Sequence, residues 1–163
     1  MSATAFSSIE FLDAALVYDP VRRRADLALD EDGSLLLDLT PATPMLVSLG
    51  SDRRALPDDE LPSGEDVLNA AGGFATRRGW PGDAVDAKRD LIGSRLWLLD
   101  REKESDLTLR RAELYAREAF GWVEDELGQA AEISVAWARR GVLRLVVRVG
   151  ETSLAILRRL GGA

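Results

Sequence analysis

Residues 105–128 read SDLTLRRAELYAREAFGWVEDELG, and this stretch predicts one long amphipathic helix. Ser105 is a favoured N-cap residue, and Gly128 is expected to end the helix. Trp122 borders the apolar sector, whereas Leu114 points into the polar face. The apolar side chains recur at intervals of three and four residues and therefore share one sector: Ala112, Tyr115, Ala116, Ala119, Phe120, Val123 and Leu127.

The segments after this helix predict a C-terminal β hairpin. Apolar and polar side chains alternate over residues 132–138 and again over residues 142–149, and an Arg-Arg-Gly turn separates the two runs. Residues 154–160 fit either an edge strand or a short helix, since periodicity does not distinguish the two in so short an apolar segment. We expect residues 152–163 to be removable with the fold largely intact.

The segments before the helix predict a β meander. Alternating apolar residues mark strands at about 14–18, 25–30 and 35–39, and turn residues separate them. Prolines then interrupt the pattern, so a change of element is expected. Residues 45–49 fit either a short helix or a strand.

Residues 57–90 have no regular pattern and predict a long irregular loop. Both an interaction loop and a solvated linker fit its acidic residues and glycines, and we expect residues 57–76 to be the least protected backbone. The elements together predict an α+β fold in one domain, residues 1–163. It would contain an N-terminal β meander, the long loop, one long amphipathic helix, and a C-terminal β hairpin in a mixed or antiparallel sheet.

The composition excludes several classes of function. The 163 residues include no cysteine and no histidine, which excludes disulfides, thiolate nucleophiles and Cys-ligated metal sites and removes the commonest metal ligand. A net charge of −7 disfavours attraction to nucleic acid or to an anionic membrane. No signal peptide or membrane-spanning run is visible, so we expect synthesis in the cytoplasm. We expect protein partners and no metal or cofactor.

Three short blocks of sequence combine arginine, glycine and large rings. They are Ser51-Asp52-Arg53-Arg54-Ala55, Arg77-Arg78-Gly79-Trp80-Pro81-Gly82-Asp83 and Ile92-Gly93-Ser94-Arg95-Leu96-Trp97-Leu98-Leu99. Tryptophan and arginine are enriched where two proteins meet, because each covers a large area and keeps a directional donor. The mixture therefore suits specified packing or protein contact better than catalysis.

In this order the blocks resemble the baseplate wedge proteins of Mu-like phages, the family called after the product of gene 46. The resemblance begins at the Asp-Leu-Ala-Leu segment of residues 26–29, includes the three blocks, the helix and the closing strands, and covers most of the chain. The chain departs from the family pattern at two places. Pro81 stands where the family has a second tryptophan, and residues 67–76 look like an insertion before the second block.

The resemblance implies a structural component of a contractile tail baseplate, in a phage, a prophage or a related injection system. Such a component acts in tail assembly and sheath initiation through contacts with other wedge, tube or sheath proteins. The implied location is the virion tail baseplate, after synthesis in the bacterial host. Some relatives carry a lysozyme label and a Glu-Pro-Arg signature, where this chain has Glu124-Asp125-Glu126. A weak homodimer in isolation is a further expectation.

The candidate interface is drawn from the three blocks. Its residues are Asp52, Arg53, Arg54, Arg77, Arg78, Gly79, Trp80, Gly82, Asp83, Gly93, Ser94, Arg95, Leu96 and Trp97. In the alternative reading Trp80 and Trp97 anchor the core, while the arginines pair internally with Asp52, Asp83 or Asp90. The two interpretations are compatible, because internal packing of the blocks provides the rigid scaffold that an interface needs.

Two further expectations concern burial and docking. Trp97 should be buried in a core shared by the long helix and the terminal hairpin. The loop of residues 77–83 and the C-terminal sheet edge should face partners, with strand addition as the docking mode of the edge.

Two other functions compete with this interpretation. A carboxylate-dependent peptidoglycan hydrolase would need two acids with distinct environments, drawn from Glu102, Glu104, Glu113, Glu118 and Glu124. Each of these lies in a charge-dense run or on a polar helix face with arginine neighbours, which favours a solvated role. The other alternative is a stand-alone protein-binding module. No catalytic residue, cofactor-binding residue or metal ligand is assigned.

Overall fold

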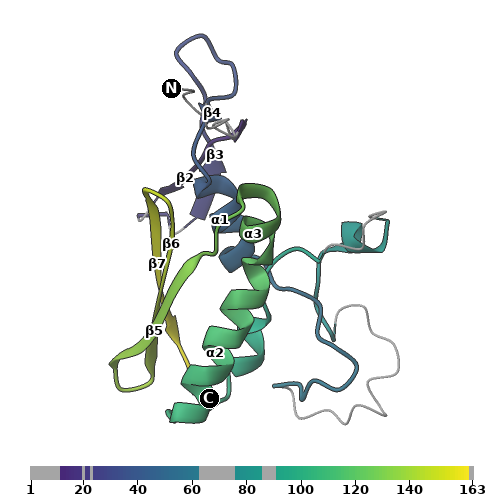
Figure 1. The fold of residues 1–163 in the computed structure, drawn as a ribbon. Coiled ribbons are helices and arrows are strands. Elements are labelled where there is room, and N and C mark those ends of the chain that lie inside the picture. The colour runs from purple at the N-terminus through teal and green to yellow at the C-terminus, as the bar shows by residue number, and fades with distance from the viewer. Residues whose placement is uncertain (1–11, 20, 23, 63–75, 86–90, 162–163) are drawn as a thin grey trace, which may run out of the picture. The chain divides into compact units, whose positions relative to one another are not determined.

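The computed structural model describes residues 12–19, 21–22, 24–62, 76–85 and 91–161 (Figure 1). The chain falls into two compact units, Met1–Pro44 and Met45–Ala163. The single domain expected from the sequence stays a prediction. Most of residues 57–76, for which the least protected backbone is expected, and nearly all of the apparent insertion lie outside the described residues.

The first unit is the expected β meander, with shorter strands than the alternation suggests. Its described residues form β1 (Asp13–Ala14), β2 (Leu16–Asp19), β3 (Arg24–Leu27) and β4 (Leu37–Asp38). Strand β2 pairs antiparallel with β3, and β1 pairs antiparallel with β4. Beyond β3 a single antiparallel bridge joins Leu29 to Leu35.

The three segments of the meander meet at Ala15, Ala28 and Leu36. The Ala15 N–H donates to the Leu36 carbonyl (2.8 Å), and the Leu36 N–H donates to the Ala28 carbonyl (2.9 Å). The Ala28 N–H closes the ring by donating to the Ala15 carbonyl (3.0 Å). Each segment thus satisfies a backbone donor of another, which holds the meander together although its strands are only two to four residues long.

Helix α1 (Ala42–Gly50) begins in the first unit and continues into the second, and it settles the ambiguous segment 45–49 as a helix. In the first unit the Thr43 hydroxyl donates to the Ala14 carbonyl (3.0 Å), which ties the start of the helix to the meander. In the second unit Met45 and Leu49 are buried at a spacing of four residues, as expected for one helical face.

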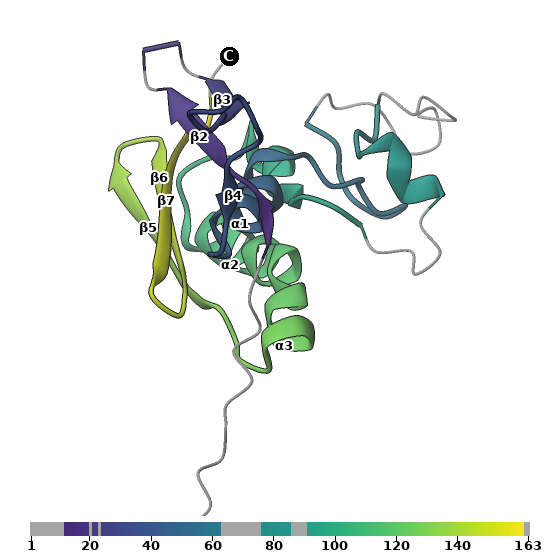
Figure 2. The ribbon, with the colours of Figure 1, turned by 90° about the horizontal axis from the view of Figure 1, so that it is seen from above.

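The second unit packs helices on one side of a three-stranded antiparallel sheet (Figures 1 and 2). Its described elements are the 3₁₀ helices η1 (Pro81–Ala84) and η2 (Arg95–Leu99), α2 (Asp106–Ala119), α3 (Gly121–Leu127), β5 (Glu132–Arg139), β6 (Val142–Val149) and β7 (Thr152–Arg159). The sheet order is β5-β6-β7, which confirms the α+β class. None of the described helices is both long enough and apolar enough to cross a membrane.

The C-terminal segment is a strand, and it forms the third strand of the sheet. All eight residues of β7 pair with β6, and the following Leu160 is buried (4% exposed). The expectation that residues 152–163 can be removed is therefore wrong, because deletion would take away one strand of three together with a core side chain.

The long amphipathic helix is bent at Phe120, where the sequence predicted a continuous helix to Gly128. Phe120 leaves the helical region (φ −108°, ψ 14°), and α3 begins at the next residue, Gly121. Its ring is buried (3% exposed), so the bend keeps Phe120 in the core. Both predicted ends are confirmed: the Ser105 side chain accepts the Thr108 N–H (3.1 Å), and Gly128 caps α3 in the left-handed region.

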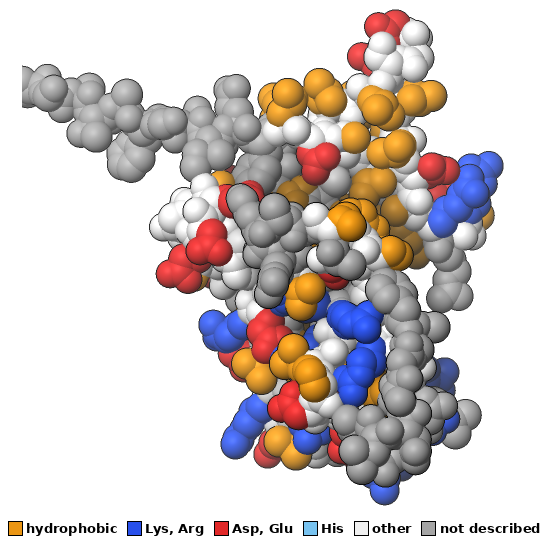
Figure 3. Space-filling model, turned by 90° about the vertical axis from the view of Figure 1, so that its right-hand side faces the viewer, with side chains coloured by type: hydrophobic (Ala, Val, Ile, Leu, Met, Phe, Trp, Pro, Cys, Tyr) orange, Lys and Arg blue, Asp and Glu red, His pale blue; other side chains and the backbone are white. Residues whose placement is uncertain are grey.

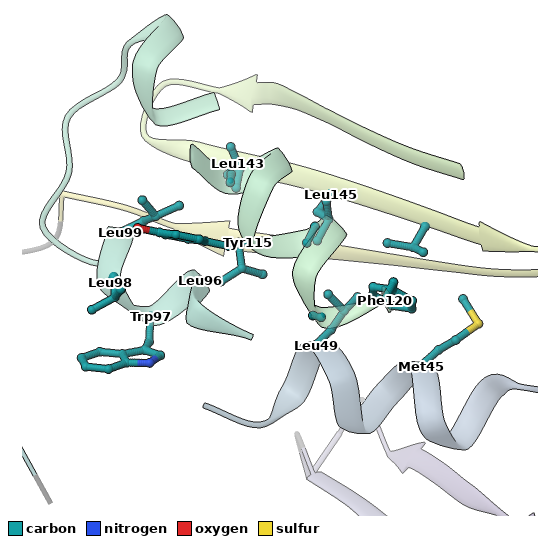
Figure 4. Close-up of a cluster of buried hydrophobic side chains, with 14 of the residues drawn as sticks. Met45, Leu49, Leu96, Trp97, Leu98, Leu99, Tyr115, Phe120, Leu143 and Leu145 are labelled. Carbon is teal, nitrogen blue, oxygen red and sulfur yellow. The ribbon is translucent and has the colours of Figure 1, made fainter. Parts of the chain in front are cut away.

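The core lies between α2, η2 and the sheet (Figure 4). Tyr115 of α2, Leu96 of η2 and Leu145 of β6 all belong to one buried cluster. Trp97 is 2% exposed, which confirms its burial. It belongs to the same buried cluster as side chains of α2 and β6, as expected, and Figure 4 shows its ring on the side of η2 that faces away from Leu143 and Leu145.

Replacing Trp97 by alanine should lower the free energy of unfolding by about 3–5 kcal/mol, the usual cost of deleting a buried aromatic side chain. A denaturant titration followed by circular dichroism would measure this. Trp80→Ala is the matched control, since that ring is 53% exposed and its loss should cost less than about 1 kcal/mol. Equal costs for the two variants would contradict the assignment.

Candidate functional site

The three sequence blocks meet in space and form what we call the motif cluster, residues 51–55, 77–83 and 92–97. Backbone hydrogen bonds join them. The Ser94 N–H donates to the Ser51 carbonyl (3.0 Å), and the Arg53 N–H donates to the Ser94 carbonyl (2.9 Å). On the other side the Ala55 N–H donates to the Arg77 carbonyl (2.9 Å). The first block is thus held by both others, although the hydrogen-bonded residues are 22 to 43 positions apart in the sequence.

Two glycines of the motif cluster are required by close backbone approach. Gly93 has φ +91°, and a Cβ atom there would lie 2.4 Å from the Ser51 carbonyl oxygen. Gly79 has φ +100°, and a Cβ atom there would lie 2.7 Å from the Cβ of Arg54. Any larger residue would push the blocks apart, which gives these two positions a physical reason to be glycine.

Arg53 connects the motif cluster to the end of α2. Its guanidinium donates to the backbone carbonyl of Glu118 (3.0 Å), in the last turn of the helix. Carbonyls in the last turn have no partner within the helix and carry its negative partial charge, so a cation there is favourable. The Arg53 carbonyl in turn accepts the indole N–H of Trp97 (2.8 Å).

Arg95 is a buried cation between two carboxylates. Its side chain is 7% exposed, and it contacts Asp59 at 2.7 Å and Glu118 at 2.6 Å. Its guanidinium also lies over the Tyr115 ring, 4.7 Å from the ring centre. The two carboxylates come from the loop after the first block and from the end of α2, so one side chain joins three parts of the second unit.

The ionisation of this group follows from its surroundings. Burial acts to lower the pKa of Arg95, but the hydrogen bonds and charges of Glu118 and Asp59 outweigh it and raise that pKa above its ordinary value. Burial also raises the pKa of the Tyr115 hydroxyl, and the charge of Asp59 adds to the effect. Arg95 therefore stays charged and Tyr115 stays neutral at physiological pH.

Arg78 covers the outer side of Trp97. Its guanidinium lies 4.5 Å from the centre of the Trp97 ring and pairs with Asp52 at 2.6 Å. The backbone of Arg78 has φ +50°, an unusual value for a residue other than glycine. This backbone conformation is unfavourable in free energy, and the surrounding contacts of Arg78 hold it in place.

The Trp80 side chain is the most exposed ring of the motif cluster. It is 53% exposed, and it lies over Gly82, where any Cβ atom would overlap its ring atoms. One face of the ring is therefore packed against its own loop, while the rest is open. The neighbouring Arg77 donates to the carbonyls of Leu56 and Pro57, which fixes the start of this loop.

The arginine pairings expected from the sequence are confirmed in one case and wrong in another. Arg78 does pair with Asp52. Arg95 finds its partners elsewhere, on the following loop and on α2. Asp83 accepts a backbone N–H of the third block (3.3 Å), and Asp90 lies outside the described residues.

Sequence reasoning missed the carboxylates of Asp59 and Glu118. The signal for Glu118 was available, because it borders the apolar sector of the helix and lies next to Ala119. Asp59 carried no such signal, since it stands among other acids in an irregular segment. Its role depends on the path of the loop, which the sequence pattern does not fix.

Four of the five acids considered as hydrolase residues have partners within the chain. The ion pairs are Glu102 with Arg111, Glu113 with Arg117 and Glu118 with Arg95. Glu104 accepts the N–H of Gly141 (3.1 Å), and Glu124 is exposed. Among the residues that the structure describes, no group of three or more acidic side chains is arranged to hold a metal ion.

Replacing Arg95 by methionine should lower the free energy of unfolding by about 3–5 kcal/mol, because two carboxylates would lose their shared buried partner. Thermal or denaturant unfolding would measure this. Arg117→Met is the matched control, since Arg117 forms an exposed pair with Glu113 that contributes about 0.5 kcal/mol. A similar small effect for both variants would show that the Arg95 pairs contribute little.

Comparison with known proteins places these features in a family. The family described as Phage protein GP46 matches residues 41–154, which include the whole motif cluster, α2, α3, β5 and β6. No solved structure matches the chain.

Two relatives cover most of the chain. The chain is 41% identical over 124 residues to Baseplate protein gp46 of Escherichia phage Mu, which spans 76% of this chain and 74% of that protein. It is 31% identical over 125 residues to Mu-like prophage FluMu protein gp46 of Haemophilus influenzae, spanning 76% and 77%. The chain belongs to the phage protein GP46 family.

Proposed function

We propose that this chain is a non-enzymatic structural component of the baseplate wedge in a contractile phage tail. It acts in tail assembly and sheath initiation through contacts with other wedge, tube or sheath proteins, and it resides in the virion tail. The observation that carries the proposal is the 41% identity to a protein named as a baseplate protein of phage Mu. The family match also includes every block of the motif cluster.

The geometry of the motif cluster supports this role. Arg95 and Trp97 are buried, and Arg53 and Arg95 join the blocks to α2, so these residues form a rigid inner part. Trp80 and Arg78 are exposed and held in fixed positions on its outer side. Exposed tryptophan and arginine on a rigid support are the residue types that most often dominate binding between proteins.

The edge of the sheet supports a second contact. Strand β7 lies at one end of the sheet order, so one of its sides has no neighbouring strand within the described residues. The Arg158 guanidinium pairs with Asp100 (2.7 Å), and the neighbouring Arg159 is exposed. We propose that this edge receives a strand from a partner, and that it accounts for a weak homodimer when the chain is isolated.

The state of the acidic side chains supports a non-enzymatic role. A glycoside hydrolase needs one carboxyl group as proton donor and a second as nucleophile or base. Here the candidate acids Glu102, Glu113 and Glu118 each form an ion pair with an arginine of the chain itself.

Replacing Trp80 by alanine should reduce incorporation of the chain into assembled baseplates at least about tenfold, as expected for an interface anchor worth more than 1.4 kcal/mol. Complementation of a gene deletion, followed by quantitative immunoblotting of purified particles, would measure it. Leu114→Ala is the matched control, because Leu114 is equally exposed (52%) and lies on α2. Normal incorporation of Trp80→Ala would remove this ring from the interface.

A lysine at Leu157, on the outer face of β7, should also reduce incorporation, since a charge on an edge strand disfavours strand addition. The fold should persist, because this side chain is 68% exposed. Leu107→Lys, on the exposed side of α2, should incorporate normally. If both lysine variants assemble like wild type, the edge of β7 is not a docking surface.

A further inference from the structure

The first unit carries an apolar arm that the proposed contacts do not use. We call residues 27–39 the leucine arm. Its leucines are between 42% and 64% exposed: Leu27, Leu29, Leu35, Leu36, Leu37 and Leu39. Figure 3 shows hydrophobic side chains gathered below an acidic tip, in the upper part of the view. Single exposed leucines are common on soluble proteins, but a contiguous group marks an interaction surface.

Backbone geometry places some of these leucines side by side. Leu29 and Leu35 are directly opposite across an antiparallel bridge, so their side chains are neighbours on one face. The turn between them is closed by the Asp30 N–H, which donates to the Ser34 carbonyl (2.8 Å). The arm is therefore a short hairpin that presents apolar side chains without burying them.

The charge of the arm restricts what can cover it. Residues 27–39 contain four acidic residues and no lysine or arginine: the acids are Asp30, Glu31, Asp32 and Asp38. The Ser34 N–H donates to the Asp32 carboxylate (2.8 Å), and this bond together with one to the Ser34 side chain lowers the pKa of Asp32. The tip of the arm is consequently anionic at any physiological pH.

We propose that the leucine arm docks into an apolar groove, rimmed by lysine or arginine side chains, on a different protein of the same baseplate. A second copy of this chain is disfavoured, because it would bring two tips of the same negative charge together. An anionic membrane surface is disfavoured for the same reason. This inference rests on the proposed function in one respect, because it takes the partner to be another protein of the baseplate.

The test uses the full chain and each of the other baseplate proteins encoded with it, purified singly and titrated by calorimetry. We expect one of them to bind. The double variant Leu29→Ser/Leu35→Ser should weaken that binding about 100-fold, or tenfold for each leucine. The triple variant Asp30→Lys/Glu31→Lys/Asp32→Lys should weaken it about tenfold in dilute buffer and less at high salt. Leu114→Ser is the control and should bind like wild type.

Several outcomes would overturn the proposal. Wild-type affinity in the double variant would show that the arm is not the contact, and the proposed function would stand if the wild-type chain is still incorporated into particles. A dimer of the isolated chain that the double variant abolishes would make a second copy the occupant. A lower denaturation midpoint for the double variant would mean that the arm packs on its own chain. Absence of the wild-type chain from particles would contradict the proposed function itself.

Discussion

The buried guanidinium of Arg95 is the interaction on which the second unit most depends. A buried cation is tolerated only when its charge and its hydrogen bonds are satisfied, and here that takes two carboxylates from separate segments. Glu118 lies at the end of α2, and Asp59 lies in the loop that follows the first block. The helix, this loop and η2 must therefore all be in place for Arg95 to have its partners. The glycines of the motif cluster then allow the backbones to approach closely enough for this to happen.

The same arrangement separates structural from binding roles within one set of motif residues. Arg95, Leu96 and Trp97 are buried and would be sensitive to change whatever the protein binds. Arg78 and Trp80 are exposed and contribute less to the core, which is why the proposed partner contact is assigned to them. A protein of an assembly needs both, since an interface on a loop is only as well defined as the scaffold below it.

The sequence predicted the fold class and the helix caps because these depend on local patterns. Ser105 and Gly128 act through their nearest backbone groups, and strand alternation reports a single buried face. The bend at Phe120 and the partners of Arg95 depend on contacts between distant segments, which periodicity does not encode. Asp59 shows the limit most clearly, because nothing near it in the sequence distinguishes it from the neighbouring Asp58.

The cyclic hydrogen bonding at Ala15, Ala28 and Leu36 also constrains how the first unit can form. Two segments alone leave the ring open, with one donor and one acceptor unsatisfied, and the β2–β3 pair by itself is a short two-stranded hairpin, which is marginally stable at best. A shift of any segment by one residue would break its hydrogen bonds to both neighbours at once. The meander should therefore fold in a single cooperative step, and partial unfolding from one end should not leave a stable two-stranded remnant.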